Sequence, residues 1–254
     1  MISEVYRKGR DAKEASYVLQ TAGTDVKNKA LAYIADALMA HSDAILSANA
    51  EDLKRAKEKG MAPAMVDRLT LTKERISAMA EGVRQVIDLR DPSGIVLDEF
   101  TRPNGLAIKK VSVPLGVIAI IFESRPNVTV DAAALCIKAG NACVLRGGSE
   151  AIASNTALTS VIRQGLKAAG LPENSVNIIE NTDRALVKEL LTLRGFIDLA
   201  IPRGGAGLIR MVVDTATVPC IETGSGVCHV YVDKDADLSM AVKIVENAKV
   251  SRPS

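Results

Sequence analysis

The first third of the chain has the hydrophobic period of amphipathic helices. Between residues 3 and 88, apolar positions recur at intervals of three and four, the spacing of a helix face that packs on a core. Thr24 and Thr72 are predicted N-caps, and Gly60 is predicted to end a helix. We interpret the charged run 51–59 as a solvated helix face. The residues of the apolar face are Leu31, Ile34, Leu38, Ile45, Leu46 and Leu53.

The pattern changes at Gly94. Residues 95–101 and 106–113 are predicted to be two strands, because the Asn104-Gly105 pair between them is a strong hairpin signal. Lys109 and Lys110 lie on the second of these strands. We therefore expect an ordinary ribbon that faces solvent at this point of the chain.

From residue 114 the chain follows the pattern of an open α/β sheet. Residues 114–122 are apolar without alternation, as in a strand that is covered on both faces. Helical and apolar segments alternate after it, which predicts a doubly wound parallel sheet whose ligands lie beyond the carboxyl ends of the strands. The predicted helices are 127–139, 154–169, 183–191 and 206–216, and the further predicted strands are 142–145, 176–179, 197–201 and 218–221.

Two of these strands are followed by the same feature, an arginine and a pair of glycines. They are Arg146-Gly147-Gly148 and Arg203-Gly204-Gly205, and each precedes a predicted helix. A sharp turn from strand to helix frees backbone N–H groups beside a guanidinium, a combination that attracts phosphate. Either copy taken singly is also consistent with a tight turn and a solvated arginine. Their repetition favours a nucleotide or an acyl phosphate.

The common nucleotide-binding motifs are absent from the sequence. Neither GxxxxGK[ST] nor GxGxxG occurs, so a nucleoside triphosphatase loses its main support. A dinucleotide site in this sheet would need a different turn chemistry.

A third turn follows the most hydrophobic strand. Ser124, Arg125 and Asn127 come directly after residue 122 and open a predicted helix, at the ligand edge of the sheet. Arg125, with the two neighbouring donors, is well placed for a phosphate or a carboxylate. The alternative is that Asn127 is an N-cap and Arg125 a surface charge.

The segment 221–229 is predicted to be a loop between two strands. It contains Glu222, a candidate general base, and Cys228, a candidate nucleophile beside His229. Neighbours on an extended strand face opposite sides, so Cys228 and His229 are not expected to pair, and Cys228 is predicted to be a core residue. The other histidine, His41, is predicted at a helix end, which disfavours Ser-His-Asp and zinc chemistry.

Composition narrows the class of protein. The chain has 254 residues, of which 48% are hydrophobic, and a mean hydropathy of +0.15, so it can bury a large core. Its 32 basic and 30 acidic residues leave a net charge of +2, and no basic run with interleaved aromatic residues supports a nucleic-acid partner.

The N-terminus lacks the apolar core of a signal peptide, and no apolar run reaches the length of a membrane span. With four cysteines and no CxxC spacing, we expect a cytosolic protein without zinc.

Several ordered segments carry a resemblance to a known family. The chain resembles the gamma-glutamyl phosphate reductases of the aldehyde dehydrogenase superfamily, and the resemblance extends over essentially the whole chain. The matching segments are 113–118, 123–135, 138–142, 145–150, 201–209, 226–229 and 247–254.

The resemblance implies a reaction. Members of this family reduce L-glutamyl 5-phosphate to L-glutamate 5-semialdehyde with NADPH in proline biosynthesis, and phosphate is released. Their cysteine thiolate attacks the acyl phosphate, and the resulting thioester accepts hydride, which splits one difficult displacement into two easier steps.

The resemblance also implies roles for residues. Arg146 would border the ribose 2′-phosphate of the cofactor, and Ser124 takes the place of an oxyanion-binding residue. Arg125 and Asn127 are candidates for the anionic groups of the substrate, and Glu222 stands where oxidising relatives keep a general base. The residues that the resemblance assigns to the cofactor site are Arg146, Gly147, Gly148, Ser149, Glu150, Arg203, Gly204, Gly205, Gly207 and Glu222.

The resemblance divides the chain into three parts. We expect a helical region in residues 1–93, an oligomerisation hairpin in 94–113 and a dinucleotide-binding α/β domain in 114–254. In the family, the nucleophilic cysteine comes about two residues beyond the match to Ser254, followed by a catalytic domain. We therefore expect the 254-residue chain alone to bind NADPH without catalysis.

The expected partners are the substrate L-glutamyl 5-phosphate, further copies of the chain through the hairpin, and glutamate 5-kinase. Two alternatives stay open at this point. The chain is either a non-catalytic nucleotide-binding or assembly module, or part of another acyl or aldehyde dehydrogenase of the superfamily.

Overall fold

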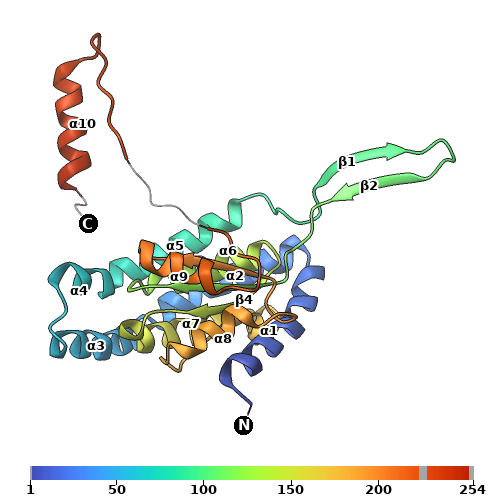
Figure 1. Cartoon of the computed structure of the whole chain (residues 1–254), viewed down its shortest axis with the longest axis horizontal. Helices are drawn as coiled ribbons and strands as arrows, with labels where there is room; N and C mark the ends of the chain where they lie inside the picture. The colour runs from blue at the N-terminus through green and yellow to red at the C-terminus, as the bar shows by residue number, and fades with distance from the viewer. Residues whose placement is uncertain (1, 223–227, 252–254) are drawn as a thin grey trace. The chain divides into compact units, whose positions relative to one another are not determined.

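The computed structural model describes residues 2–222 and 228–251 (Figure 1). The chain divides into two compact units, residues 1–223 and residues 224–254. The described part of the second unit contains α10 (Leu238–Val250), whose N-cap Asp237 accepts hydrogen bonds from the N–H groups of Ser239 and Met240. Within the described residues, no helix is both long and apolar enough to cross a membrane.

The predicted helical region is confirmed. Its helices are α1 (Glu4–Thr21), α2 (Thr24–Ala40), α3 (Ser42–Glu58), α4 (Pro63–Leu69) and α5 (Lys73–Asp88). Leu31, Ile34, Leu38 and Ile45 are buried, as the spacing predicted, while Leu46 and Leu53 are half-buried. His41 lies between α2 and α3, at the predicted helix end.

The predicted helix ends have mixed outcomes. Thr72 caps α5 by accepting a hydrogen bond from Arg75 N at 3.2 Å, and Gly60 follows α3 in the left-handed conformation (φ 66°), so both predictions are confirmed. The prediction for Thr24 is wrong, because Gly23 occupies the N-cap position of α2. The Thr24 hydroxyl instead donates to Asp91 Oδ2 at 2.7 Å.

The charged run 51–59 is exposed at most of its positions, but Asp52 is fully buried, which corrects the prediction of a solvated face. Its carboxylate accepts hydrogen bonds from Ser154 N at 2.8 Å and Ser154 Oγ at 2.6 Å, at the start of α7 (Ile152–Ala168). A helix N-terminus offers unpaired N–H groups and a positive dipole end, and these stabilise the buried negative charge.

The central sheet is parallel, with strand order β5-β4-β3-β6, as the doubly wound prediction requires. Its strands are β3 (Val117–Phe122), β4 (Ala142–Arg146), β5 (Val176–Ile178) and β6 (Leu199–Arg203). Every residue of β3, β4 and β5 is buried. Successive strands step from β3 to β5 in one direction, and the chain then crosses back to β6, so the switch point lies beside β3.

Helices cover both faces of this sheet. The α6 (Asn127–Lys138) and α7 crossovers lead away from β3 in one direction, whereas α8 (Ala185–Thr192) leads back, so right-handed connections place α8 on the opposite face. The first helix α1 contacts α8 and strands β3 to β5, while α2 and α5 form an outer layer against α6 and α7 (Figure 1). The remaining helix of this part, α9 (Ala206–Thr215), follows β6.

The predicted strand 218–221 is wrong. The segment makes an isolated bridge to β6, in which Ala200 N donates to Pro219 O and Ile221 N donates to Ala200 O. Pro219 has no N–H group, so it cannot extend the ladder on its side of the bridge.

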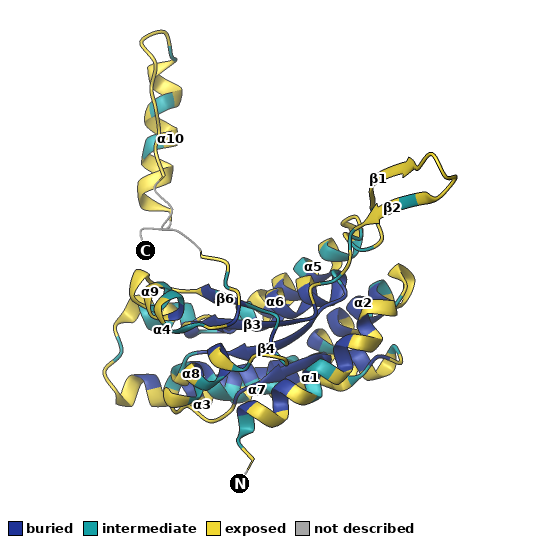
Figure 2. Cartoon of the chain, turned by 45° about the vertical axis from the view of Figure 1, so that its right-hand side comes forward, coloured by how far each residue is buried: buried dark blue, intermediate teal, exposed yellow. Residues whose placement is uncertain are grey.

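The predicted hairpin is confirmed as β1 (Val96–Thr101) paired antiparallel with β2 (Ala107–Val111). Figure 2 shows the arm in the colour of exposed residues along nearly all of its length. Lys109 pairs with Glu99 at 3.1 Å across the ribbon. Within the unit formed by residues 1–223, the arm is thus a ribbon that faces solvent, as the sequence predicted.

Candidate functional site

The turn after β3 is held by a carboxylate from the turn after β4. Ser124 has a φ of 38°, an uncommon conformation for a residue other than glycine, and it is buried. Its N–H and its hydroxyl both donate to Glu150 Oε1, at 2.8 and 2.5 Å. These bonds join two of the turns that the sequence singled out.

The turn after β4 is built around a buried guanidinium. Arg146 donates to the carbonyl oxygens of Gly147 and Thr182, the second at 2.9 Å, and burial lowers the pKa of the guanidinium. A Cβ atom at Gly147 would overlap the side-chain amide of Asn155 and lie 3.1 Å from the Phe122 ring. Close packing therefore requires a glycine at this position. The predicted contact of Arg146 with a 2′-phosphate stays a prediction.

The turn after β6 presents an anion cradle. Gly205 N, at the start of α9, donates to Glu123 Oε2 at 2.9 Å. A Cβ atom at Gly204 would fall against the same carboxylate and 2.7 Å from Leu208 Cδ2, whereas one at Gly207 would meet open space. The N-terminus of α9 thus already binds a negatively charged group, as expected of unpaired N–H groups at a helix start.

Two of the three turns line a cavity of about 610 Å³ at the carboxyl ends of the strands, and α9, which follows the third turn, lines it as well. The turn after β3 contributes Glu123 and Ser124, the turn after β4 contributes residues 146–150, and α9 contributes Gly207. The part of the wall formed by α8 and α9 is apolar and contains Val187, Leu208 and Met211. Directly before this wall in the chain lie Arg203, Gly204 and Gly205. The N–H of Gly205 donates to Glu123, which lines the cavity. The structure thus brings the turns after β3 and β4 together at one cavity and places the turn after β6 next to it.

Arg125 and Asn127 stand apart from that cavity. Arg125 is exposed, and its guanidinium has no hydrogen-bond or ion-pair partner among the described residues. Asn127 Nδ2 donates to Asp131 Oδ2 at 3.0 Å within α6. The alternative role of Asn127 as an N-cap is wrong, because Pro126 occupies that position.

The loop predicted at 221–229 is described only at its ends, since residues 223–227 lie outside the described residues. Glu222 is exposed and belongs to no helix or strand, and its predicted role stays a prediction. Cys228 is exposed, so its prediction as a core residue is wrong, because no strand forms there to bury it. The expected position beyond Ser254 lies outside the described residues as well. No cluster of three or more metal-ligating side chains occurs within the described part of the chain.

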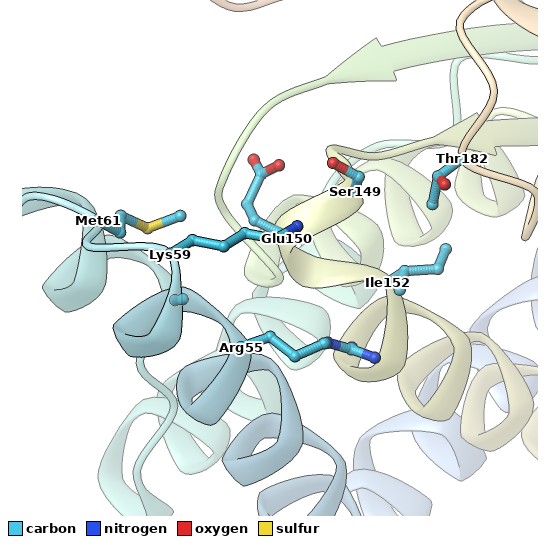
Figure 3. A pocket seen from close by; sticks show the side chains of 8 residues that line it. Arg55, Lys59, Met61, Ser149, Glu150, Ile152 and Thr182 are labelled. Atoms are coloured by element: carbon cyan, nitrogen blue, oxygen red, sulfur yellow. The ribbon is translucent and has the colours of Figure 1, made fainter.

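A smaller cavity of about 300 Å³ was not anticipated from the sequence (Figure 3). Arg55 and Lys59 from the end of α3 line it together with Ser149, Glu150 and Thr182, which also line the larger cavity. The available signal was the four-residue spacing of the two cations, which places them on one helix face. That signal was hidden in a charged run interpreted as a solvated surface.

The chain is similar to known proteins both in sequence and in fold. The sequence profile described as the Aldehyde dehydrogenase family matches residues 3–252. A gamma-glutamyl phosphate reductase of Moorella thermoacetica is 57% identical over 250 residues, which cover 98% of this chain and 60% of the relative. The crystal structure of gamma-glutamyl phosphate reductase from Thermotoga maritima matches with a TM-score of 0.92 and 49% identity, over 99% of this chain and 61% of that one. The Saccharomyces cerevisiae enzyme of the same name matches with a TM-score of 0.80 and 35% identity, over 99% and 64%.

The chain therefore spans about three fifths of the length of the relatives it matches. The comparisons cover the helical region, the hairpin and the sheet together.

Proposed function

Because this chain belongs to the aldehyde dehydrogenase family, we propose that it forms the cofactor-binding part of an NADPH-dependent reductase that converts L-glutamyl 5-phosphate to L-glutamate 5-semialdehyde and phosphate. The observation that carries the proposal is the larger cavity at the sheet edge, which the predicted turns after β3 and β4 line together with the start of α9. Open α/β sheets bind their ligands at this edge, beside the switch point. Relatives that carry the name of this reductase support the choice of reaction.

The residues of the cavity fit a dinucleotide. Gly205 N already donates to a carboxylate, so the start of α9 has the donor that a diphosphate needs. Gly207 leaves open space beside it. Arg146 Nε is buried and has no hydrogen-bond partner among the described residues, which leaves one cationic donor unused. Phosphate oxygens are suitable acceptors for both kinds of donor.

We assign the parts of the cofactor to the parts of this cavity. The diphosphate would replace the Glu123 carboxylate at Gly205, and the adenine would lie against Val187, Leu208 and Met211. The ribose would lie beside the turn 147–150, with Glu150 as an acceptor for its hydroxyl groups. When bound, NADPH would supply the hydride that reduces the acyl group.

The turn after β3 is assigned to the substrate. Ser124 presents an N–H and a hydroxyl side by side, the donor pair that stabilises a developing oxyanion, once the bonds to Glu150 give way. Arg125, in the same turn, has a guanidinium with no partner among the described residues and would bind the phosphate or carboxylate of the substrate. Asn127 would support Arg125 from the first turn of α6.

The wider organisation is part of the proposal. We assign the dinucleotide domain to residues 114–254, the packing region to 1–93 and an oligomerisation arm to 94–113. The arm exposes Val96, Leu97, Phe100 and Leu106, apolar side chains that a second copy of the chain would cover. Glutamate 5-kinase as a partner and a cytoplasmic location belong to the same proposal and follow from the biosynthetic role.

The reverse reaction tests the proposal in the whole protein that contains this chain. We expect glutamate 5-semialdehyde to reduce NADP⁺ only when inorganic phosphate is present, measured by the absorbance of NADPH. Absence of phosphate-dependent turnover would contradict the assigned reaction.

The substrate assignment has its own variant. Arg125→Ala should raise the KM for the semialdehyde or phosphate by about tenfold or more, since a charge-assisted contact is lost. Its affinity for NADPH should be unchanged. Arg90→Ala removes another exposed arginine that has no partner among the described residues, and it should behave as wild type. An unchanged KM for both substrates in Arg125→Ala would show that Arg125 does not hold the substrate anion.

A further inference from the structure

The smaller cavity adjoins the proposed cofactor cavity. Ser149, Glu150 and Thr182 line both, so the two cavities lie on either side of the same turn. The volume of about 300 Å³ is ample for a phosphate group and its hydration. The two cavities have different chemistry, because the apolar side chains of α8 and α9 line only the larger one.

The backbone fixes the cationic wall of this cavity. At the end of α3, Met61 N donates to Ala56 O and Gly60 N to Lys57 O, both at 3.0 Å, the bonding pattern that terminates a helix through a left-handed glycine. Ala56 also packs with Leu69 and Ala151 in a small buried cluster. The end of α3 is thereby held against the start of α7, and Lys59 emerges from a defined position.

Arg55 is oriented by a buried acid. It forms an ion pair with Asp52, whose carboxylate is already satisfied by Ala153 N, Ser154 N and Ser154 Oγ at the start of α7. Arg55 lines the cavity and its side chain stays 45% exposed, so the ion pair does not enclose the guanidinium. A guanidinium has five N–H donors, more than one carboxylate oxygen can use.

Lys59 is the free charge of the cavity. Its ammonium has no ion-pair or hydrogen-bond partner among the described residues. Figure 3 shows it extending from the end of α3 toward the Ser149-Glu150 turn, one helical turn beyond Arg55. Glu150, the acid that lines the cavity, uses Oε1 to accept both bonds from Ser124. A lysine that forms no ion pair among the described residues, beside the hydroxyl groups of Ser149 and Thr182, favours an anionic ligand.

We propose that this cavity is the recognition site for the ribose 2′-phosphate of NADPH, with Lys59 as the principal contact and Arg55 as its partner. The inference rests on the proposed dinucleotide function of the larger cavity. A diphosphate held at Gly205 and a second anion site beyond Glu150 match the two separated negative groups of NADPH, with the apolar wall of α8 and α9 at hand for the base. NADH carries no second group of this kind, so the pair Arg55 and Lys59 sets the preference for the phosphorylated cofactor.

Arg146 is a weaker choice for this contact. Its guanidinium donates to the carbonyl oxygens of Gly147 and Thr182 and would have to leave them to bind a phosphate through the same atoms. Lys59 gives up no such bond. Arg146 instead fixes the turn that lies between the two cavities.

Binding measurements on the 254-residue chain test the proposal. NADPH and NADH are titrated by their own fluorescence, which no tryptophan obscures, and 2′,5′-ADP and 5′-ADP are compared by calorimetry. Lys59→Ala should weaken NADPH and 2′,5′-ADP by about tenfold, the loss of one charge-assisted contact. Binding of NADH and 5′-ADP should stay within about twofold of wild type.

Matched variants separate the contact from general electrostatics. Lys57→Ala removes a cation from the same last turn of α3 outside the cavity, and should bind both cofactors as wild type does. Lys59→Arg should keep most of the preference, whereas Lys59→Glu should weaken NADPH more than Lys59→Ala. Thermal unfolding of each variant checks that the fold is retained.

The outcomes distinguish this inference from the proposed function. If wild type binds NADPH and NADH but Lys59→Ala leaves their ratio unchanged, or weakens both equally, the inference is overturned and the larger cavity keeps its assignment. If wild type shows no preference between the two cofactors, the inference also fails by itself. If wild type binds neither cofactor, the proposed function fails and the inference with it.

Discussion

The turns after β4 and β6 share an arginine and two glycines, yet they differ in what these residues do. In the first, Arg146 is buried and bonded to two backbone carbonyls, and Gly147 is packed against Phe122 and Asn155. In the second, Arg203 is exposed, and the N–H of Gly205 is free to bind a carboxylate. The first turn is a rigid frame, whereas the second is an anion cradle.

The difference shows that a strand-to-helix turn takes its role from what surrounds it. The turn after β4 lies in the interior of the sheet, between β3 and β5, so its arginine is enclosed and satisfied by carbonyl groups. The turn after β6 lies next to the outer strand of the described sheet, where side chains remain in contact with solvent. The same Arg-Gly-Gly motif thus has a structural role in one turn and a binding role in the other.

The largest expected effect comes from the frame. Gly147→Ala should lower the free energy of unfolding by about 2 kcal/mol, because the new methyl group overlaps the buried Asn155 amide, which is itself held by Thr129. Gly207→Ala, in the first turn of α9, should leave stability unchanged or raise it slightly, since its Cβ meets open space. Urea denaturation measures both. Equal losses at the two positions would remove the distinction between frame and cradle.

Substitutions of the two arginines, Arg146 and Arg203, should differ in the same way in their effect on stability. Arg146→Met leaves the carbonyl oxygens of Gly147 and Thr182 without their donor and should cost about 1–3 kcal/mol of stability. Arg203→Met should stay within about 0.5 kcal/mol of wild type, because the side chain is exposed. Thermal unfolding of the two variants side by side decides this, and a stable Arg146→Met would show that the buried guanidinium does not hold its turn.

The smallest expected effect is a gain in the affinity for NADPH. Glu123→Gln should raise the affinity for NADPH about threefold to tenfold, because the carboxylate competes with a diphosphate for Gly205 N and repels its charge. Glu81→Gln, an exposed acid on α5, serves as the control. Calorimetric titration gives both affinities. A loss of affinity in Glu123→Gln alone would mean that the carboxylate helps to bind the cofactor rather than standing in its place.

Much of the fold was predictable because its signals are local. The three-and-four spacing of Leu31, Ile34 and Leu38 and the unbroken apolar run of β3 each report burial through the residues themselves. The errors arose where the burial or the hydrogen bonding of a residue depends on partners that are distant in the sequence. Asp52 is buried because Ser154, far along the chain, offers a helix start, and Thr24 is drawn away from capping by Asp91.

Part of the candidate site could be predicted because it depends on local signals. The prediction of the rest was incomplete because it depends on distant partners. Neighbouring parallel strands end at the same edge of a sheet, so the sequence could predict that the turns at Ser124, Arg146 and Gly205 lie close together. The orientation of Arg146 and the carboxylate of Glu123 at Gly205 depend on packing that no spacing encodes. Lys59 was missed because it comes from a helix outside the sheet, whose position follows from its packing against α7.

Amide hydrogen exchange tests most directly whether the frame and the cradle form a single cofactor site. The 254-residue chain is titrated with NADPH, and the exchange of residues 147–149 and 204–207 is followed by NMR or mass spectrometry. We predict that both turns become protected together, with the same midpoint and at one equivalent of cofactor. Protection of only one turn, or of the two at different midpoints, would contradict a site built from both.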